Sequence, residues 1–244
     1  MYSVEMADCP HYSTMFNEDY DIITAKTETE FFHKIHYLSV DGAIICFCSA
    51  REYDVENILR LDALTGPIAV LICSKILNPE FVSKAAQQGV EHFLTCDMET
   101  EKIVNTIDDA IRYIGLKKYF KLRWPNSLDS SPHVSKLVDE IIRFFPQRMK
   151  VEELAAKLGI NRSWLHKLCK ESFGRSLTAL MRHIWVYQAL YMMQNTNLKN
   201  LDITMQLNYS EESSMARDFR KELGCCPNEA RKRLTEQNPE DLLL

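Results

Sequence analysis

The feature that most constrains this chain is a helix-turn-helix pattern that occurs twice, once on each side of a long apolar segment. In residues 151–170, apolar residues recur at helical spacing up to Leu158. Gly159 then permits the left-handed backbone of a sharp helix end, and Asn161 is a good cap for a second helix. The expected inward side of that second helix holds Leu165, Leu168 and Cys169. The pattern predicts two short helices joined by a tight turn.

The outer side of the second helix is cationic and polar. It consists of Arg162, Ser163, His166, Lys167 and Lys170, which share one face and include no acid. Such a face suits the major groove of DNA, where side chains form hydrogen bonds with base edges. An ordinary solvated helix face has a similar composition, so this stretch alone leaves both interpretations open.

A second copy of the pattern occupies residues 201–223. The expected buried residues are Leu201, Ile203 and Leu207 in its first helix, Tyr209 in the corner, and Met215, Phe219 and Leu223 in its second helix. The outer face of that second helix holds Ser213, Arg217 and Arg220 at i, i+4 and i+7. The repetition favours a domain with two reading helices.

Residues 176–196 separate the two copies and contain neither Gly nor Pro. Apolar residues cover more than half of the helix that this segment predicts, so it must pack on two sides. The expected buried residues are Leu177, Leu180, Met181, Ile184, Trp185, Ala189, Met192 and Met193. Such a helix spans roughly 30 Å, close to the roughly 34 Å between successive major-groove faces on one side of DNA. Reading helices at its two ends could therefore enter adjacent grooves.

The run from residue 151 to residue 233 resembles the DNA-binding domain of the AraC/XylS family of bacterial transcription regulators. The resemblance covers residues 134–234, with Phe173-Gly174 after the first reading helix and Gly224, Pro227 and Arg231 near the end. It implies double-stranded DNA and RNA polymerase as partners. It also implies that bases in one groove are contacted by Ser163, His166 and Lys167, and bases in the next groove by Ser213 and Arg217.

The departures from this family gather in the second copy. Thr204 stands where the family favours Ala, Asn208 where it favours Gly, and Met215 where it favours an aromatic residue. Glu211 and Glu212 begin the second reading helix, where nearby phosphates would repel them. A Glu can also accept a hydrogen bond from cytosine N4, so base reading and a weakened second contact both remain open.

Charge divides the chain in two. Residues 1–115 hold 19 acids against 8 bases, a net charge of −11, and residues 116–244 hold 15 against 21, a net charge of +6, within a total of −5. The basic half is the one expected to meet DNA. We expect an N-terminal domain at 1–115, a linker at 116–133, the DNA-binding domain at 134–234 and a frayed tail at 235–244.

Short apolar runs alternate with amphipathic segments in residues 1–115, as in βα units. The expected strands are 2–7, 20–25, 42–48, 68–73 and 92–96, and the expected helices are 28–35, 55–64, 79–88 and 100–114. This order, with the runs that begin at Asp41, Gly66 and Gly89, resembles the receiver domain of two-component response regulators. The resemblance implies a doubly wound α/β fold beside the all-α C-terminal domain, and a homodimer formed through the receiver-like domain.

The residues of receiver chemistry are missing. Cys46 stands where the family phosphorylates an Asp, and Cys96 stands where it has a Lys. The position of the Ser or Thr falls near Ile72, with Ser74 two residues away, and only Asp8 has a plausible place among the magnesium ligands. Without an acceptor carboxylate and charge neutralisation we expect no phosphorylation, and hence a pseudo-receiver.

Five cysteines lie near the carboxyl ends of the expected strands, where open α/β sheets bind ligands. They are Cys9, Cys46, Cys48, Cys73 and Cys96. They could hold a metal ion or form a redox-switched disulfide, and Cys46 and Cys96 are expected to converge on one cleft. Buried packing residues explain the same pattern, because Cys behaves as a small hydrophobe and a reducing cytosol keeps thiols reduced.

The sequence lacks a Gly-rich phosphate loop, a nucleophile-elbow pattern and a metal-binding spacing of His and carboxylates, so we expect no enzyme. It also lacks an 18-residue apolar run and a signal-peptide pattern, which favours a cytoplasmic protein without a membrane partner. Three functions remain. The first is a DNA-binding transcription regulator, the second a redox- or metal-responsive regulator, and the third a regulator that acts through protein contacts after losing DNA binding.

Overall fold

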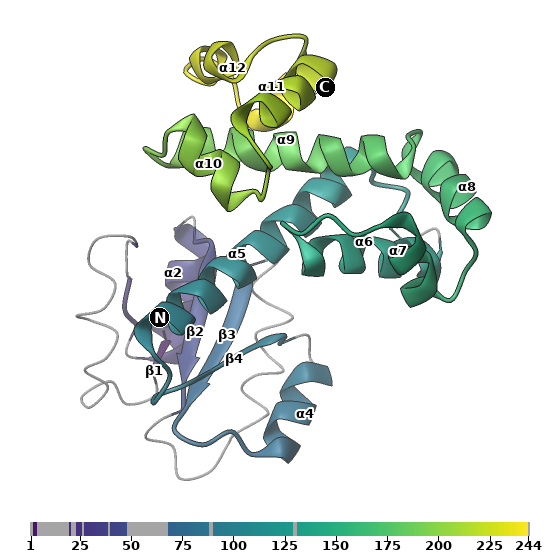
Figure 1. Cartoon of the computed structure of the whole chain (residues 1–244). Helices are drawn as coiled ribbons and strands as arrows, with labels where there is room; N and C mark the ends of the chain where they lie inside the picture. The colour runs from purple at the N-terminus through teal and green to yellow at the C-terminus, as the bar shows by residue number, and fades with distance from the viewer. Residues whose placement is uncertain are drawn as a thin grey trace. The chain divides into compact units, whose positions relative to one another are not determined.

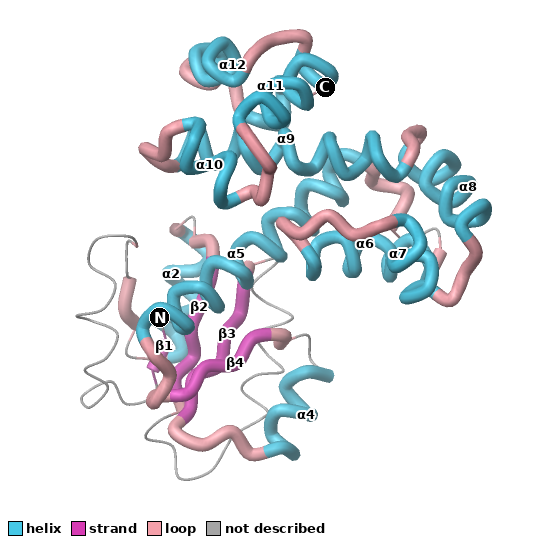
Figure 2. The backbone as a smooth tube through the Cα atoms, viewed as in Figure 1, coloured by secondary structure: helices cyan, strands magenta, loops and turns pink. Residues whose placement is uncertain are grey.

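The computed structural model describes residues 2–3, 20, 23–25, 27–38, 40–47, 68–87, 90–128 and 131–243. The chain forms two compact units, Met1–Leu116 and Lys117–Leu244 (Figure 1). The first unit is built on a parallel sheet, and the second consists of helices (Figure 2).

The sheet of the first unit has four described strands in the order β1-β2-β3-β4. They are β1 (Tyr2–Ser3), β2 (Gly42–Cys46), β3 (Ala69–Ser74) and β4 (His92–Thr95). Every neighbouring pair is parallel, and the register sets Cys46 beside Cys73. The central strands are almost continuously apolar, as expected for a parallel sheet covered on both faces.

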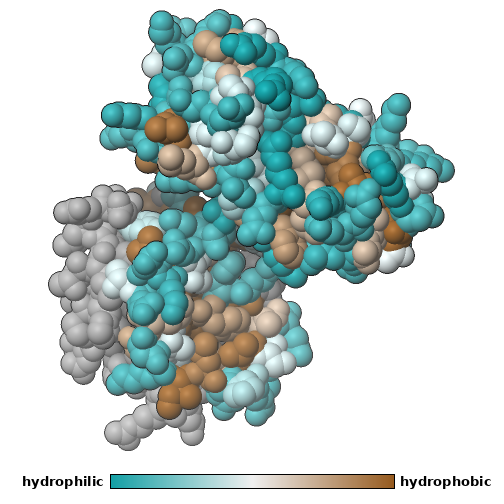
Figure 3. All heavy atoms as spheres, viewed as in Figure 1, coloured by the Kyte–Doolittle hydropathy of each residue, from teal (hydrophilic) through white to brown (hydrophobic). Residues whose placement is uncertain are grey.

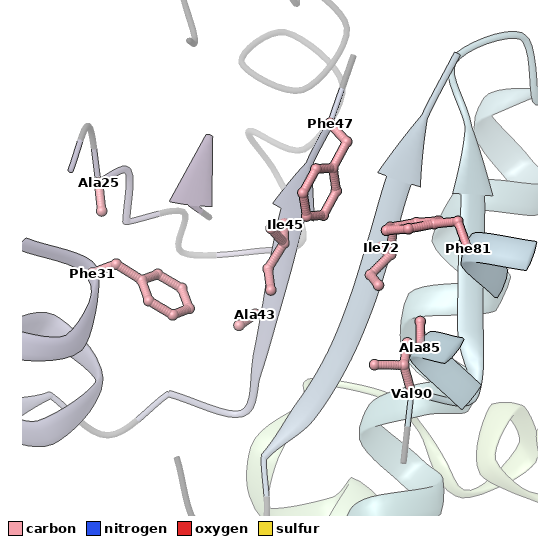
Figure 4. Close-up of a cluster of buried hydrophobic side chains, with 9 residues drawn as sticks. All are labelled: Ala25, Phe31, Ala43, Ile45, Phe47, Ile72, Phe81, Ala85 and Val90. Carbon is pink, nitrogen blue, oxygen red and sulfur yellow. The ribbon is translucent and has the colours of Figure 1, made fainter. Parts of the chain in front are cut away.

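Successive strand residues alternate between two separate cores. One core holds Ile45 and Ile72 against Phe31 of α2 (Glu28–Tyr37) and Phe81 of α4 (Pro79–Gln87), and Figure 4 shows these side chains pointing toward one another. The other core gathers strand residues against Ile103, Ile107 and Ala110 of α5 (Thr100–Arg123). Helices therefore cover both faces, and the doubly wound α/β fold is confirmed.

One expected strand is not formed where the structure describes it. Of the described residues 20 and 23–25, only Ala25 makes a bridge. Thr27 then caps α2, and the carbonyl of Thr24 accepts from Lys34 Nζ at 2.7 Å. Several predictions lie outside the described residues. They are residues 4–7 of the first strand, the helix at 55–64, the start of the run at Gly66, Gly89, and the positions of Asp8, Cys9 and Cys48.

The second unit is arranged around α9 (Leu177–Asn195), whose Trp185 and Leu190 are fully buried. The helices before it are α6 (Pro132–Phe144), α7 (Val151–Leu158) and α8 (Arg162–Phe173). The helices after it are α10 (Asn200–Gln206), α11 (Glu212–Leu223), α12 (Pro227–Arg233) and α13 (Pro239–Leu242). Because α8, α10, α11, α12 and α13 all contact α9, the expectation that this helix packs on more than one side is confirmed.

The segments expected to be a linker and a tail both contribute to the core of the second unit. Helix α5 continues to Arg123, where Tyr119 stacks on Tyr187 and Phe120 packs edge-on against Phe173. In the tail, Leu243 is buried, and the Tyr187 hydroxyl donates to Glu240 at 2.9 Å. These contacts hold the end of α5 and the short helix α13 (Pro239–Leu242) against the rest of the second unit. None of the helices in the described ranges is long and apolar enough to cross a membrane.

Candidate nucleic-acid interface

The first helix pair has the turn that the sequence predicts. Gly159 is left-handed with a φ of 68°, and the Ile160 N–H donates to the Ala155 carbonyl, which closes the end of α7. Asn161 caps α8 by accepting from the Trp164 N–H at 2.8 Å. Both ends of the turn are therefore fixed by local hydrogen bonds.

Helix α8 presents the expected face to solvent. Leu165, Leu168 and Cys169 are buried, and burial raises the pKa of the Cys169 thiol to about 12. The opposite side holds the exposed Arg162, Ser163, Lys167 and Lys170, together with the half-buried His166. The side of the second unit seen in Figure 3 is mainly hydrophilic, with small separate hydrophobic patches.

This face is not free of acids, contrary to the expectation from sequence. Arg162 lies 3.1 Å from Glu152 of α7, and Lys167 lies 3.7 Å from Glu171 one helical turn later. Helical spacing within α8 alone could not reveal the first pair, because Glu152 belongs to another helix. All four side chains are more than 60% exposed, so the pairs are weak and the cations can exchange them for phosphates.

The turn of the second helix pair uses Asn208 where the first pair uses Gly159. Asn208 takes the left-handed conformation with a φ of 53°, which explains how Asn serves where the family favours Gly. Tyr209 is buried in the corner as expected, and the indole N–H of Trp185 donates to the Leu207 carbonyl at 3.1 Å. The corner is thereby attached to α9.

Leu201 was expected on the buried side of α10 but is 49% exposed. Thr204 is buried instead. Its hydroxyl can be buried because it donates to the carbonyl of Asn200, one helical turn earlier, at 2.7 Å. The same hydroxyl lies 3.6 Å from the sulfur of Met215 in α11. Two departures from the family pattern, Thr204 and Met215, are therefore in contact with each other.

The outer face of α11 holds Ser213, Arg217 and Arg220, and all three are exposed. Glu211 stands at the cap position and Glu212 begins the helix, where carboxylates are stabilised by the helix dipole. The Ser213 hydroxyl donates to Glu211 at 2.5 Å. The two acids therefore help to start the helix. This local role is compatible both with base reading by α11 and with a weakened DNA contact there.

A buried carboxylate that no sequence pattern predicts, Glu222, lies at the end of α11. It accepts from Arg175 at 2.7 Å and from Arg182 at 2.6 Å, and its side chain is only 4% exposed. It also lies 3.1 Å from His183 Nδ1, whose other ring nitrogen is 2.7 Å from the Tyr119 hydroxyl. This cluster joins α5, α9 and α11 with the segment that follows α8.

The protonation states of the cluster follow from these contacts. Burial alone would raise the pKa of Glu222, but hydrogen bonds from His183, Arg182 and Arg175 outweigh it and lower the pKa to about 2. Burial lowers the pKa of His183 despite the nearby carboxylate. Neutral His183 then donates from Nδ1 to Glu222 and accepts from the Tyr119 hydroxyl at Nε2. No local pattern marks Glu222, because its partners are about 40 residues away in the chain.

Arg231, noted above as part of the family pattern, has a structural role here. Its guanidinium donates to the carbonyls of Met193 and Leu198 and to the side chain of Asn200. It thereby connects α12 to the end of α9 and the start of α10. This contact holds the second helix pair on the central helix, which at about 1.5 Å per residue is about 28 Å long.

In the first unit, Cys46, Cys73 and Cys96 all belong to or pack against one core. The sulfurs of Cys73 and Cys96 are 3.9 Å apart, whereas Cys46 is the neighbour of Cys73 in the sheet register. The Ser74 hydroxyl donates to the Ile76 carbonyl, so it is used locally. Among the residues placed by the structure, no group of three or more His, Cys, Asp or Glu could hold a metal ion.

Comparison with known proteins supports the assignment of the second unit. Residues 154–233 match the family described as "Helix-turn-helix domain". The HTH-type transcriptional activator AarP of Providencia stuartii is 25% identical over 130 residues, which cover 52% of this chain and 95% of that protein. The lactose operon transcription activator of Staphylococcus xylosus is 27% identical over 105 residues, 43% of this chain and 38% of that protein. The Msm operon regulatory protein of Streptococcus mutans is 23% identical, over 35% of this chain and 31% of its own length.

Two solved structures also align. A transcriptional regulator with an AraC-type DNA-binding domain from Chromobacterium violaceum has 17% identity and a TM-score of 0.41, and covers 45% of this chain and 97% of its own. The C-terminal domain of a two-component response regulator from Fusobacterium nucleatum has 20% identity and a TM-score of 0.39, over 41% and 99%. The chain spans only about a third of the length of the Streptococcus and Staphylococcus relatives. The family match and the two helix pairs show that residues 154–233 are a helix-turn-helix domain of the AraC type.

Proposed function

We propose that this protein is a transcription regulator that binds double-stranded DNA through α8 and α11. The observation that carries the proposal is a pair of exposed faces with basic residues, one on each of two helices that pack on α9. Side chains on such helices can reach base edges in the major groove. A DNA-binding role of this kind needs no catalytic step. A regulator with this role would act in the bacterial cytoplasm, where the DNA is.

The two reading helices have different proposed roles. On α8, Ser163, His166 and Lys167 contact bases, while Arg162 and Lys170 at the ends of the face contact phosphates. On α11, Ser213 and Arg217 contact bases, and Arg220 contacts a phosphate. Helix α9, on which both reading helices pack, is about 28 Å long, and we propose that α8 and α11 enter successive major-groove faces.

The test begins with selection of a binding site from a random DNA library by the full chain. Fluorescence anisotropy at two salt concentrations then measures its affinity. Lys167→Ala and Arg217→Ala are each expected to cost roughly 1–3 kcal/mol of specific binding. Lys84→Ala removes one exposed lysine from the other unit and serves as the matched control. If both reading-face variants bind like the control variant, the proposed faces are wrong.

The second candidate function is a regulator that acts by protein contact without binding DNA. Glu211 and Glu212 at the start of α11 favour it, because they would lie close to the phosphates of a bound duplex. Failure of the full chain to retain any duplex at low salt would support this function, since phosphate contacts alone give measurable binding there. Loss of affinity in Lys167→Ala but not in Arg217→Ala would instead mean that α8 alone reads DNA.

For the first unit we propose a pseudo-receiver that forms a homodimer and is not phosphorylated. The proposal rests on the residues at the strand ends, with Cys46 closing β2 and Cys96 directly following β4. Neither residue can form an acyl phosphate. Sedimentation of the full chain over a range of concentrations tests the homodimer, and transcription in vitro with purified RNA polymerase tests whether the polymerase is a partner.

A further inference from the structure

Two cysteine sulfurs of the first unit are in contact. Cys73 belongs to β3, Cys96 directly follows the adjacent strand β4, and their Sγ atoms are 3.9 Å apart. The register pairs Cys73 with Leu94, so Cys96 lies two residues further along. Since the sulfurs of a disulfide are about 2.05 Å apart, they would have to approach by about 1.9 Å to bond.

The two thiols differ in backbone setting and in access to solvent. Cys73 is fully buried, in a strand that is hydrogen-bonded to β2 and β4 on its two sides. Cys96 is partly exposed and lies in a turn, where its N–H donates to the Ser74 carbonyl at 3.3 Å. The approach is therefore expected to come from Cys96, which is also the thiol that a dissolved oxidant can reach.

We propose that Cys73 and Cys96 form a reversible disulfide when the protein meets a hydroperoxide. The Cys96 thiolate attacks one peroxide oxygen, an S–O bond forms, the O–O bond breaks and hydroxide leaves. The Cys73 sulfur then attacks the sulfenic sulfur, the S–S bond forms and the S–O bond breaks. The proton of Cys73 leaves with that oxygen as water. Two thiols and one hydrogen peroxide thus give one disulfide and two waters, and a dithiol reductant reverses the change.

The surroundings favour a disulfide over a metal site. Where the structure places residues, it brings together no set of three or more ligands for a metal ion. Cys46 shares the core face of Cys73, but it is only 4% exposed and lies in the strand on the other side. An oxidant from solution therefore meets Cys96 before Cys46.

The disulfide would form next to the start of α5. The turn that carries Cys96 leads directly into this helix, and the Ile103 N–H donates to the Glu99 carbonyl. Ile103, Ile107 and Ala110 of α5 belong to the same core as Cys73. The chemistry itself does not depend on DNA binding, so it holds or fails independently of the proposed function.

The test treats the full chain with hydrogen peroxide, blocks the remaining thiols with an alkylating reagent and digests with trypsin without reduction. Cleavage after Lys and Arg leaves Cys73 in peptide 61–75, Cys96 in peptide 85–102, and Cys46 with Cys48 in peptide 35–51. We expect a cross-linked ion of 61–75 with 85–102 that disappears after treatment with a dithiol. A cross-link between 35–51 and 61–75, or no cross-link, would overturn the proposal.

Three variants complete the test. Cys96→Ser should abolish the cross-link and leave Cys73 open to alkylation only after unfolding. Cys46→Ser is the matched control, because it removes a neighbouring thiol and should keep the cross-link. Cys169→Ser, in the buried side of α8, should also keep it. Survival of a cross-link to 61–75 in Cys96→Ser would mean that another cysteine is the partner.

Discussion

Replacing Glu222 by Gln keeps the shape of a buried side chain and removes its charge. In the wild-type protein the carboxylate accepts hydrogen bonds from Arg175, Arg182 and His183 and is only 4% exposed. These partners lower the pKa of Glu222 from 4.5 to about 2. A shift of this size corresponds to about 3 kcal/mol of folding free energy at neutral pH. We expect Glu222→Gln to lower the free energy of unfolding by about that amount.

The same contacts predict how stability depends on pH. The folded-state pKa of Glu222 is depressed, so its contribution is complete above pH 4.5 and is lost as the pH falls toward 2. The pKa of His183 is also depressed, so the folded state favours the neutral ring and loses stability as the pH falls below 6.5. Both effects act in the same direction. Because Glu222→Gln removes the carboxylate that titrates, the difference in free energy of unfolding between wild type and this variant should shrink as the pH falls below 4.5.

Urea unfolding of the full chain, followed by tryptophan fluorescence, measures this difference. The three tryptophans, Trp124, Trp164 and Trp185, all lie in the second unit, so the signal reports that unit. Glu229→Gln is the control, because it breaks an exposed pair with Arg233 and should cost at most about 0.5 kcal/mol. A loss in Glu222→Gln no larger than the control, with the same pH profile as wild type, would refute the reasoning.

Three further predictions concern other parts of the chain. A fragment of residues 117–243 should unfold cooperatively in urea, and 134–234 should be less stable by at least about 3 kcal/mol, because the shorter fragment loses the buried Tyr119, Phe120 and Leu243. Equal stability of the two fragments would contradict that packing. Asn208→Val should cost about 1–2 kcal/mol in the fluorescence assay because of its φ of 53°, while Asn208→Gly should be nearly neutral. Acetyl phosphate should leave the intact mass of the protein unchanged, since Cys46 replaces the acceptor, and an acid-labile phosphoryl adduct would argue for a working receiver.

The helices of the second unit could be predicted from sequence because their signals are local. The apolar spacing up to Leu158, the left-handed Gly159 and the capping Asn161 all act within a few residues of one another. The α/β pattern of the first unit was predictable for the same reason, since strand-length apolar runs alternate with amphipathic helices.

Other features depend on partners that are distant in the chain. The choice between Leu201 and Thr204 as the buried residue of α10 is made by the surface of α9 and α11, and periodicity within seven residues cannot decide it. The extension of α5 to Arg123 depends on Tyr187 and Phe173, more than 50 residues later. The contact between Cys73 and Cys96 depends on strand register and on a turn, and neither is visible in the spacing of the cysteines.

The contact between Thr204 and Met215 bears on how such sequences diverge. A scoring scheme that treats positions independently counts two mismatches here, whereas in the packed interior the two side chains touch and share one volume. A smaller residue in α10 with a larger ring in α11, or a hydroxyl in α10 with a flexible thioether in α11, can fill the same volume. Homologous domains should therefore vary at these two sites together, and sequences that change only one of them should be rare.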